Sequence, residues 1–275
     1  MLRNFKNEID FWLRRHLKWS LRNASKKIET LTTPNQVTPE SKTLIQQYPE
    51  MQKYAAYLPE YQWLENLNLL SLLNQVSTEI NIPPPPIISE PVRVLEVGMK
   101  NWSTLPALTS FLKLKTERPV SITGIELDLW RVYTNGKSRF DELQDNIALV
   151  KHVASDNVEI NWLEGDVCEL DEKPFDIVCC FLPFVFENPH LLWGLPRRYF
   201  NPNVFFQKLS QLVSPEGYLV LCNQGEAEFN EQKKLLEHLD FKIKKSGLVS
   251  QPFLDLKHQR YAWVLHKTTQ PVKSR

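Results

Sequence analysis

The chain has 275 residues, of which 42% are hydrophobic and 24% charged, so it holds enough apolar side chains for a packed core and is not a disordered protein. Its longest nearly continuous apolar run, 177–186, contains a proline and is too short to cross a bilayer. The net charge of +1 hides an asymmetry, because residues 1–31 carry a net charge of +5.

The first 31 residues predict a basic amphipathic helix. Apolar side chains recur there at helical spacing: Leu2, Phe5, Ile9, Trp12, Leu13, Leu17, Leu21, Ala24 and Ile28. Such a helix usually packs against its own domain with a solvated basic face. Contact with an anionic membrane surface or with nucleic acid is the alternative, and the interleaved Trp12 and Trp19 favour it.

Two further helices are expected, at 40–56 and 59–78. The four prolines of 83–86 then end all helical structure, since proline removes a backbone donor and favours an extended polyproline conformation. This divides the chain into a helical extension over 1–88, a main domain over 89–268 and a short tail over 269–275.

After the prolines, short apolar runs alternate with helical patterns. Strands are predicted at 92–97, 120–126, 158–163, 175–181, 217–222, 240–248 and 259–266. Helices are predicted at 103–115, 138–154, 203–213 and 226–239. Such alternation indicates a doubly wound, mostly parallel α/β sheet. No helix separates the last two strands, so the final strand is expected to run in the reverse direction.

Ligands of such sheets bind beyond the carboxyl ends of the strands. The residues at those ends are therefore the candidates for a site: Glu96 and Gly98 in the first strand and its loop, Glu126 in the second, Asp166 after the third, and Pro183 and Phe184 after the fourth. The four cysteines form no C-x-x-C pair, so neither a metal site nor a disulfide framework is expected.

In order and spacing, 92–266 resembles the class I S-adenosylmethionine-dependent methyltransferases. The resemblance implies S-adenosyl-L-methionine as cofactor, with Gly98 close to it, Glu126 accepting from its ribose hydroxyls and Asp166 from its adenine amino group. Glu96 would organise donors near the methionine end. The complete cofactor-binding set is predicted to be Glu96, Gly98, Lys100, Asn101, Glu126 and Asp166.

The first loop departs from the family pattern. It reads Gly98-Met99-Lys100-Asn101-Trp102 where the family has Gly-x-Gly-x-Gly, so two of three glycines are missing. We expect Asn101 to take the left-handed backbone, which asparagine tolerates better than most residues. A protein that binds a nicotinamide dinucleotide would need a glycine-rich loop around the pyrophosphate. The interpretation as a methyltransferase is therefore preferred over that as a dinucleotide-binding protein.

The fourth strand end matches only half of a family motif. Pro183 and Phe184 fit the Asn/Asp-Pro-Pro-aromatic signature of enzymes that methylate planar amino groups, but Phe181 stands where the motif has Asn or Asp. Phe184 is therefore predicted to stack on a planar substrate, without a prediction of amino-group methylation.

The segment 187–201 is the predicted substrate segment, since it follows the fourth strand. Trp193, Arg197 and Arg198 are its candidate substrate residues, with the arginines suited to an anionic group. His190 and Tyr199 are the candidate bases. Each of these residues also has an ordinary structural explanation, as a turn residue, a buried side chain or a solvated charge.

Methyl transfer to an unidentified acceptor, a small molecule in the first instance, is the predicted function, in a cytoplasmic protein. One alternative is a catalytically degenerate relative that acts as a binding or regulatory module, which the depleted glycine loop favours. The other is a methyltransferase bound to a membrane surface or nucleic acid through residues 1–31.

Overall fold

The computed structural model describes residues 2–21, 28–82, 90–154 and 157–268. Within these residues, seven strands form one sheet in the order β3-β2-β1-β4-β5-β7-β6. Their bounds are β1 Val92–Val97, β2 Val120–Glu126, β3 Val158–Glu164, β4 Phe175–Phe181, β5 Val213–Gln224, β6 Lys242–Val249 and β7 Arg260–His266.

β1 pairs in parallel with both β2 and β4, so the chain reverses its direction of winding between these strands. β7 is antiparallel to its neighbours β5 and β6. The predicted doubly wound sheet with a reversed last strand is confirmed. A ligand site is expected where the winding reverses, beyond the carboxyl ends of β1 and β4.

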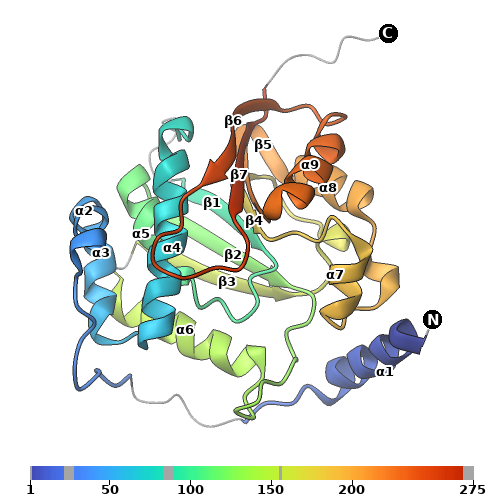
Figure 1. Ribbon diagram of the computed structural model, residues 1–275, viewed down its shortest axis with the longest axis horizontal. Coiled ribbons are helices and arrows are strands. Elements are labelled where there is room, and N and C mark those ends of the chain that lie inside the picture. Colours follow the sequence, from blue (N-terminus) through green and yellow to red (C-terminus); the bar gives the residue numbers. More distant parts are fainter. Residues whose placement is uncertain (1, 22–27, 83–89, 155–156, 269–275) are drawn as a thin grey trace.

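Helices cover both faces of the sheet (Figure 1). Their bounds are α1 Leu2–Leu17, α2 Pro39–Gln47, α3 Pro49–Gln52, α4 Glu60–Val76, α5 Leu105–Lys115, α6 Arg139–Val153, α7 Glu187–Leu192, α8 Pro202–Leu212 and α9 Gly225–Leu236. Short 3₁₀ turns span Lys53–Ala56, Ser77–Glu79, Val167–Glu169 and Arg197–Tyr199. None of the described helices is long and apolar enough to cross a membrane.

The alternation of side chains along β1 divides the core into two parts. Val92 and Val94 face one cluster, built with α2 to α6, while Leu95 and Val97 face a second cluster, built with α8 and α9. Helices α2, α3 and α4 of the N-terminal extension therefore share a core with the first face of the sheet (Figure 1).

The predicted helix over 1–31 is wrong at 18–21 and 28–31, and its part over 22–27 lies outside the described residues. Lys18 takes a left-handed backbone with φ of 44°, which ends α1, and the N–H of Leu31 donates to the carbonyl of Ala56 instead of to a helical partner. The predicted helix over 40–56 is interrupted at Tyr48, because the residue before Pro49 is driven out of the helical region. The prolines of 83–86, the boundary at 88 and the tail lie outside the described residues.

Gly124 in β2 makes room for the loop that follows β1. A Cβ at this position would lie 2.9 Å from two ring atoms of Trp102 and would also collide with the Met99 sulfur. Trp102 is fully buried, so its ring cannot move aside into solvent. The absence of a side chain at Gly124 therefore lets the loop pack down onto the sheet.

We predict that Gly124→Ala destabilises the protein by about 1–3 kcal/mol, the usual cost of overpacking a core. Urea denaturation followed by circular dichroism measures the change. Thr123→Ala, at the preceding strand position, is the control and should lose much less. Equal losses in the two variants would contradict the tight contact with Trp102.

Candidate functional site

A cavity of about 530 Å³ opens at the carboxyl edge of the sheet, where the winding reverses. Its wall brings together residues that follow β1, β2, β3 and β4, which are far apart in sequence. The predicted site residues in this wall are Gly98, Lys100, Glu126, Asp166, Pro183, Phe184, His190, Trp193 and Tyr199. Glu96, Asn101, Arg197 and Arg198 do not line it.

The loop after β1 keeps a left-handed backbone at the three positions where the family pattern has glycine. The φ angles are 75° at Gly98, 56° at Lys100 and 56° at Trp102. Asn101 is not among the left-handed residues, so the prediction for that position was wrong. A left-handed backbone costs a residue with a Cβ about 1–2 kcal/mol, so contacts elsewhere must hold Lys100 and Trp102 in place.

Those contacts are hydrogen bonds to two buried carboxylates. The backbone N–H of Lys100 donates to Glu126 Oε2 at 2.9 Å, and the indole N–H of Trp102 donates to Glu96 Oε2 at 2.7 Å. Asn146 in α6 also donates to the carbonyl of Asn101, at 2.8 Å. The loop is thus fastened to β1, β2 and α6.

Helix α4 supports the far end of the same loop. The side-chain oxygen of Asn66 accepts from the N–H of Ala107 at 2.9 Å, and its amide nitrogen donates to the carbonyl of Ser103 at 2.8 Å. Glu65 accepts from the Ser103 hydroxyl at 2.7 Å. Asn66 of α4 therefore satisfies one N–H of the first turn of α5, whose own N-cap residue makes no side-chain hydrogen bond.

Glu126 connects three parts of the site. Besides the N–H of Lys100, its carboxylate accepts from the N–H of Asp128 at 2.9 Å and from Arg139 Nη1 at 2.9 Å. Glu126 and Arg139 are both buried, so this is a desolvated ion pair. A carboxylate offers about four acceptor positions, which leaves one for a ligand.

Glu96 lies beneath the loop and outside the cavity wall. It is buried in β1, and burial raises the pKa of its carboxyl group to about 7, although the Trp102 hydrogen bond and the positive charge of Lys100 lower it. Its hydrogen bond goes to Trp102 of the loop and not to a group in the cavity wall. Glu96 therefore holds the loop in position and does not itself line the site.

Three cations surround the ring of Trp193. The Lys100 ammonium lies 5.4 Å from the ring centroid, and the guanidinium carbons of Arg131 and Arg139 each lie 5.8 Å from it. The buried Nε of Arg139 has no hydrogen-bond partner. The sequence does not single out Arg139 as a site residue. The available signal is the capping box formed by Ser138 and Asp141, which fixes the start of α6 and so the position of Arg139.

His190 is buried beside the aromatic wall of the cavity. Its Nε2 lies 2.8 Å from the carbonyl of Pro196, which only accepts, so Nε2 carries the proton and Nδ1 the lone pair. Burial lowers the pKa of His190, while the Pro196 carbonyl and the charge of Glu187 oppose this effect. The ring of Phe184 meets the imidazole edge to face at 5.4 Å.

The two predicted substrate arginines are engaged elsewhere. Arg197 pairs with Glu187, and Arg198 pairs at 2.7 Å with Glu8 of α1. Tyr199 does line the cavity, and its ring packs against Phe11 of α1 with centroids 5.2 Å apart. The segment 187–201 therefore supplies the cavity with aromatic groups, while its arginines hold the surrounding elements together.

On the adenine side of the predicted site, Asp166 caps a short 3₁₀ turn by accepting from the N–H of Cys168 at 2.9 Å. Glu228 of α9 lines another part of the wall. Burial raises the pKa of Glu228, although it accepts from the N–H of Gln224 at 3.0 Å. Nothing in the sequence distinguishes Glu228 from the other glutamates of its helix, so this residue was missed as well.

Helix α1 lies along the rim of the cavity. Arg14 makes two hydrogen bonds to the buried carboxylate of Asp128, at 2.8 and 3.0 Å. The side-chain amide of Asn7 donates to the carbonyls of Leu191 and Leu195, at 2.9 and 3.0 Å. These bonds attach α1 to the turn that carries Trp193.

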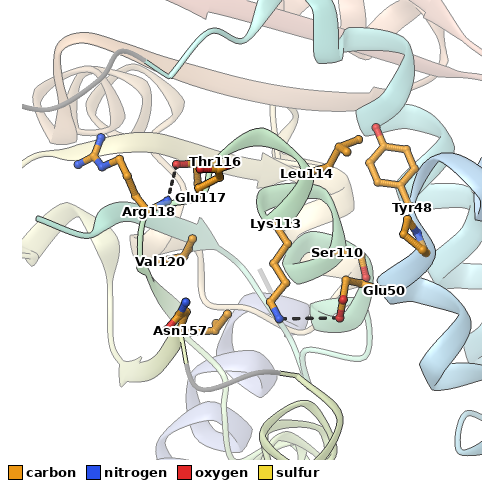
Figure 2. A pocket seen from close by; sticks show the side chains of 12 residues that line it. Tyr48, Glu50, Ser110, Lys113, Leu114, Thr116, Glu117, Arg118, Val120 and Asn157 are labelled. Atoms are coloured by element: carbon orange, nitrogen blue, oxygen red, sulfur yellow. Dashed lines mark hydrogen bonds and ion pairs between the residues drawn. The ribbon is translucent and has the colours of Figure 1, made fainter. Parts of the chain in front are cut away.

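A second cavity, of about 360 Å³, lies at the opposite edge of the sheet. Figure 2 shows Lys113 and Glu50 facing each other across it, with Nζ and Oε2 3.8 Å apart. Val120 and Val158, the first residues of β2 and β3, also line it. Since ligands of these sheets bind at the carboxyl edge, this cavity is not the candidate site.

No family model and no curated protein matches this chain. Among solved structures, it is similar to a protein from Listeria monocytogenes described as a class I S-adenosylmethionine-dependent methyltransferase, with a TM-score of 0.51 and 14% identity. That alignment covers 76% of this chain and 61% of the Listeria protein, so this chain spans only about three fifths of it. At this identity the likeness shows the fold, and it confirms the predicted class I methyltransferase fold.

Two further structures have lower scores. TrmN from Thermus thermophilus aligns with a TM-score of 0.47 at 17% identity, over 74% of this chain and 48% of TrmN. Magnesium protoporphyrin IX methyltransferase from Synechocystis, solved with bound S-adenosylhomocysteine, aligns with a TM-score of 0.45 at 11% identity, over 97% of this chain and 98% of the enzyme.

The raised pKa of Glu96 predicts a stability that depends on pH. The folded state keeps a proton on Glu96 up to about pH 7, whereas the unfolded chain loses it near 4.5, so this contribution is present at low pH and is lost as the pH rises through 7. Between pH 5 and 8, the unfolding free energy of the wild type should fall relative to Glu96→Gln by an amount on the order of 3 kcal/mol. Urea denaturation at several pH values measures this. Glu117→Gln, at an exposed position, should run parallel to the wild type; a parallel curve for Glu96→Gln would contradict the prediction.

Proposed function

We propose that the protein transfers a methyl group from S-adenosylmethionine to an acceptor bound beside α7. The observation that carries this proposal is the loop after β1, whose left-handed positions at 98, 100 and 102 keep the backbone form of a glycine loop and which contacts Glu126, at the end of β2, through the N–H of Lys100. Such a loop lets a ligand approach the backbone closely beside a fixed acceptor.

The residues present fit this cofactor. Gly98 lines the cavity with no protein atom within 4 Å of the place where a Cβ would stand, so the backbone there is open to a ligand. Glu126 would accept from one ribose hydroxyl with its remaining acceptor position. Asp166 would accept from the adenine amino group with the carboxylate oxygen that Cys168 does not use. The cavity volume lies within the range of cofactor sites.

When bound, S-adenosylmethionine supplies a methyl group activated by a positively charged sulfur. The chain's own contribution is alignment and proton removal. Phe184 and Trp193 would bind the apolar part of an acceptor and exclude water. His190 would take the proton released by the acceptor at Nδ1, since its lowered pKa keeps the imidazole neutral near pH 7.

A cofactor-free binding module is the second candidate function. The buried ion pair between Glu126 and Arg139 favours it, because most of the carboxylate's acceptor capacity is already used within the protein. In this case the cavity would hold a ligand without methyl transfer. Cofactor binding distinguishes the two proposals.

Calorimetric titration with S-adenosylmethionine and S-adenosylhomocysteine tests the proposal, with NAD and NADP as control ligands. We expect micromolar binding of the first two only. Glu126→Ala should weaken that binding by about 1–3 kcal/mol, the usual cost of losing a charged hydrogen-bond partner. Arg197→Ala should leave the affinity unchanged, because Arg197 lies outside the cavity wall.

Thermal melting of each variant verifies that the comparison is made between folded proteins. A wild-type protein that melts cooperatively and binds neither sulfur compound would reject methyl transfer and support the binding module. Equal affinities in the wild type and folded Glu126→Ala would show that Glu126 does not contact the cofactor.

A further inference from the structure

Helix α1 is attached to the protein by its polar face. Asn7 and Arg14 contact α7, the turn after it and Asp128, as described above. In addition, Asn4 Oδ1 accepts from the N–H of Arg197 at 2.8 Å, and Glu8 pairs with Arg198. In most surface helices the apolar side faces inward, so this attachment is inverted.

The apolar side of the helix consequently faces away from the protein. Six of its seven large apolar side chains are between 40% and 87% exposed: Leu2, Phe5, Ile9, Trp12, Leu13 and Leu17. Their spacing of three and four residues places them on one side of the helix. The seventh, Phe11, is buried on the attached side, against Tyr199. Trp19 and Leu21, just beyond the helix, are exposed as well. In Figure 1, α1 lies at the edge of the molecule, beside α7.

Most basic residues of α1 and of the residue that follows it are paired with acids of the same chain. Arg14 is paired with the buried Asp128, and Arg15 and Lys18 both reach Glu164, at 3.7 and 2.9 Å. Nucleic-acid binding would require these cations to face the phosphates. The observed arrangement therefore presents an apolar surface to a partner and uses most of the positive charge for internal pairing.

A second copy of the chain would have to offer a surface that matches this one. A stable interface buries roughly 800 Å² of accessible surface on each partner, whereas the apolar side of α1 is a single strip about 24 Å long. A bilayer needs no matching partner surface, because it takes up one apolar helix face at the boundary of headgroups and acyl chains.

We propose that α1 docks this protein onto a phospholipid membrane surface. The apolar side would enter the acyl boundary, with Trp12 and Trp19 at the headgroup level that tryptophan prefers. Arg3 and Lys6 are both exposed on α1, with Lys6 also paired with Asp10 at 2.8 Å, and would reach the phosphates of anionic headgroups. The contacts to Leu191 and Leu195 would hold the cavity rim beside the membrane. This docking does not depend on the proposed methyl transfer.

Co-sedimentation of the full chain with vesicles tests the proposal, using phosphatidylcholine with and without phosphatidylglycerol. The test variant combines Phe5→Ser, Ile9→Ser and Trp12→Ser. The matched control combines Leu114→Ser, Val204→Ser and Leu248→Ser, which remove exposed apolar side chains from α5, α8 and β6. We expect wild type and control to bind, more tightly with phosphatidylglycerol, and the test variant to partition more than about tenfold less.

Thermal melting should be the same for the wild type and the test variant, since the polar face that attaches α1 is unchanged. Absence of vesicle binding by the wild type would overturn the proposal, as would equal binding by the test variant and the control. If the wild type does not bind vesicles, two further results would show what α1 contacts instead and would also overturn the proposal. One is self-association of the wild type that the test variant abolishes, and the other is steeply salt-dependent binding of the wild type to RNA.

Discussion

The carboxylate of Glu126 is the constraint on which the carboxyl edge of the sheet depends. It stands at the end of β2 and accepts from the loop after β1, from the turn after β2 and from Arg139 at the start of α6. The neighbouring Asp128 then holds Arg14 of α1 and Arg131, which in turn donates to the carbonyl of Trp193. Glu126 and Asp128 thereby connect the loop after β1, helix α1 and the aromatic wall of the cavity.

The loop after β1 shows how a backbone form can be kept without the residues that usually permit it. Glycine adopts the left-handed region at little cost, whereas Lys100 and Trp102 need compensation. Trp102 obtains it by burial against Gly124 and by its bond to Glu96, and Lys100 by its bond to Glu126. At these two positions, tertiary contacts stabilise a backbone conformation that the residues themselves do not favour.

Much of the fold was predictable because it follows from periodicity. The seven strands, the helices between them and the reversed last strand are all expressed as apolar patterns and as the presence or absence of a helix between strands. Gly98, Glu126 and Asp166 were also predictable as cavity residues, since the end of a strand fixes which edge they occupy.

What was missed depends on contacts between distant residues. The end of α1 at Leu17 and the left-handed position at Lys100 instead of Asn101 have no local signature. For Arg139 the capping box fixes the start of α6 but does not show that the side chain reaches the cavity. The clearest case is which side of α1 faces the rest of the protein. Its apolar spacing correctly indicates an amphipathic helix, but periodicity does not tell which side the rest of the protein will hold.

The left-handed lysine in the first loop also changes what that loop can distinguish. A loop of glycines presents a ligand with main-chain groups alone and carries no formal charge. At position 100 an ammonium is added, in a cavity wall where desolvation lowers its pKa and Arg139 stands nearby. A ligand carboxylate or phosphate beside the Lys100 ammonium would gain from this charge. The lysine at this left-handed position therefore gives the loop a preference for negatively charged ligand groups.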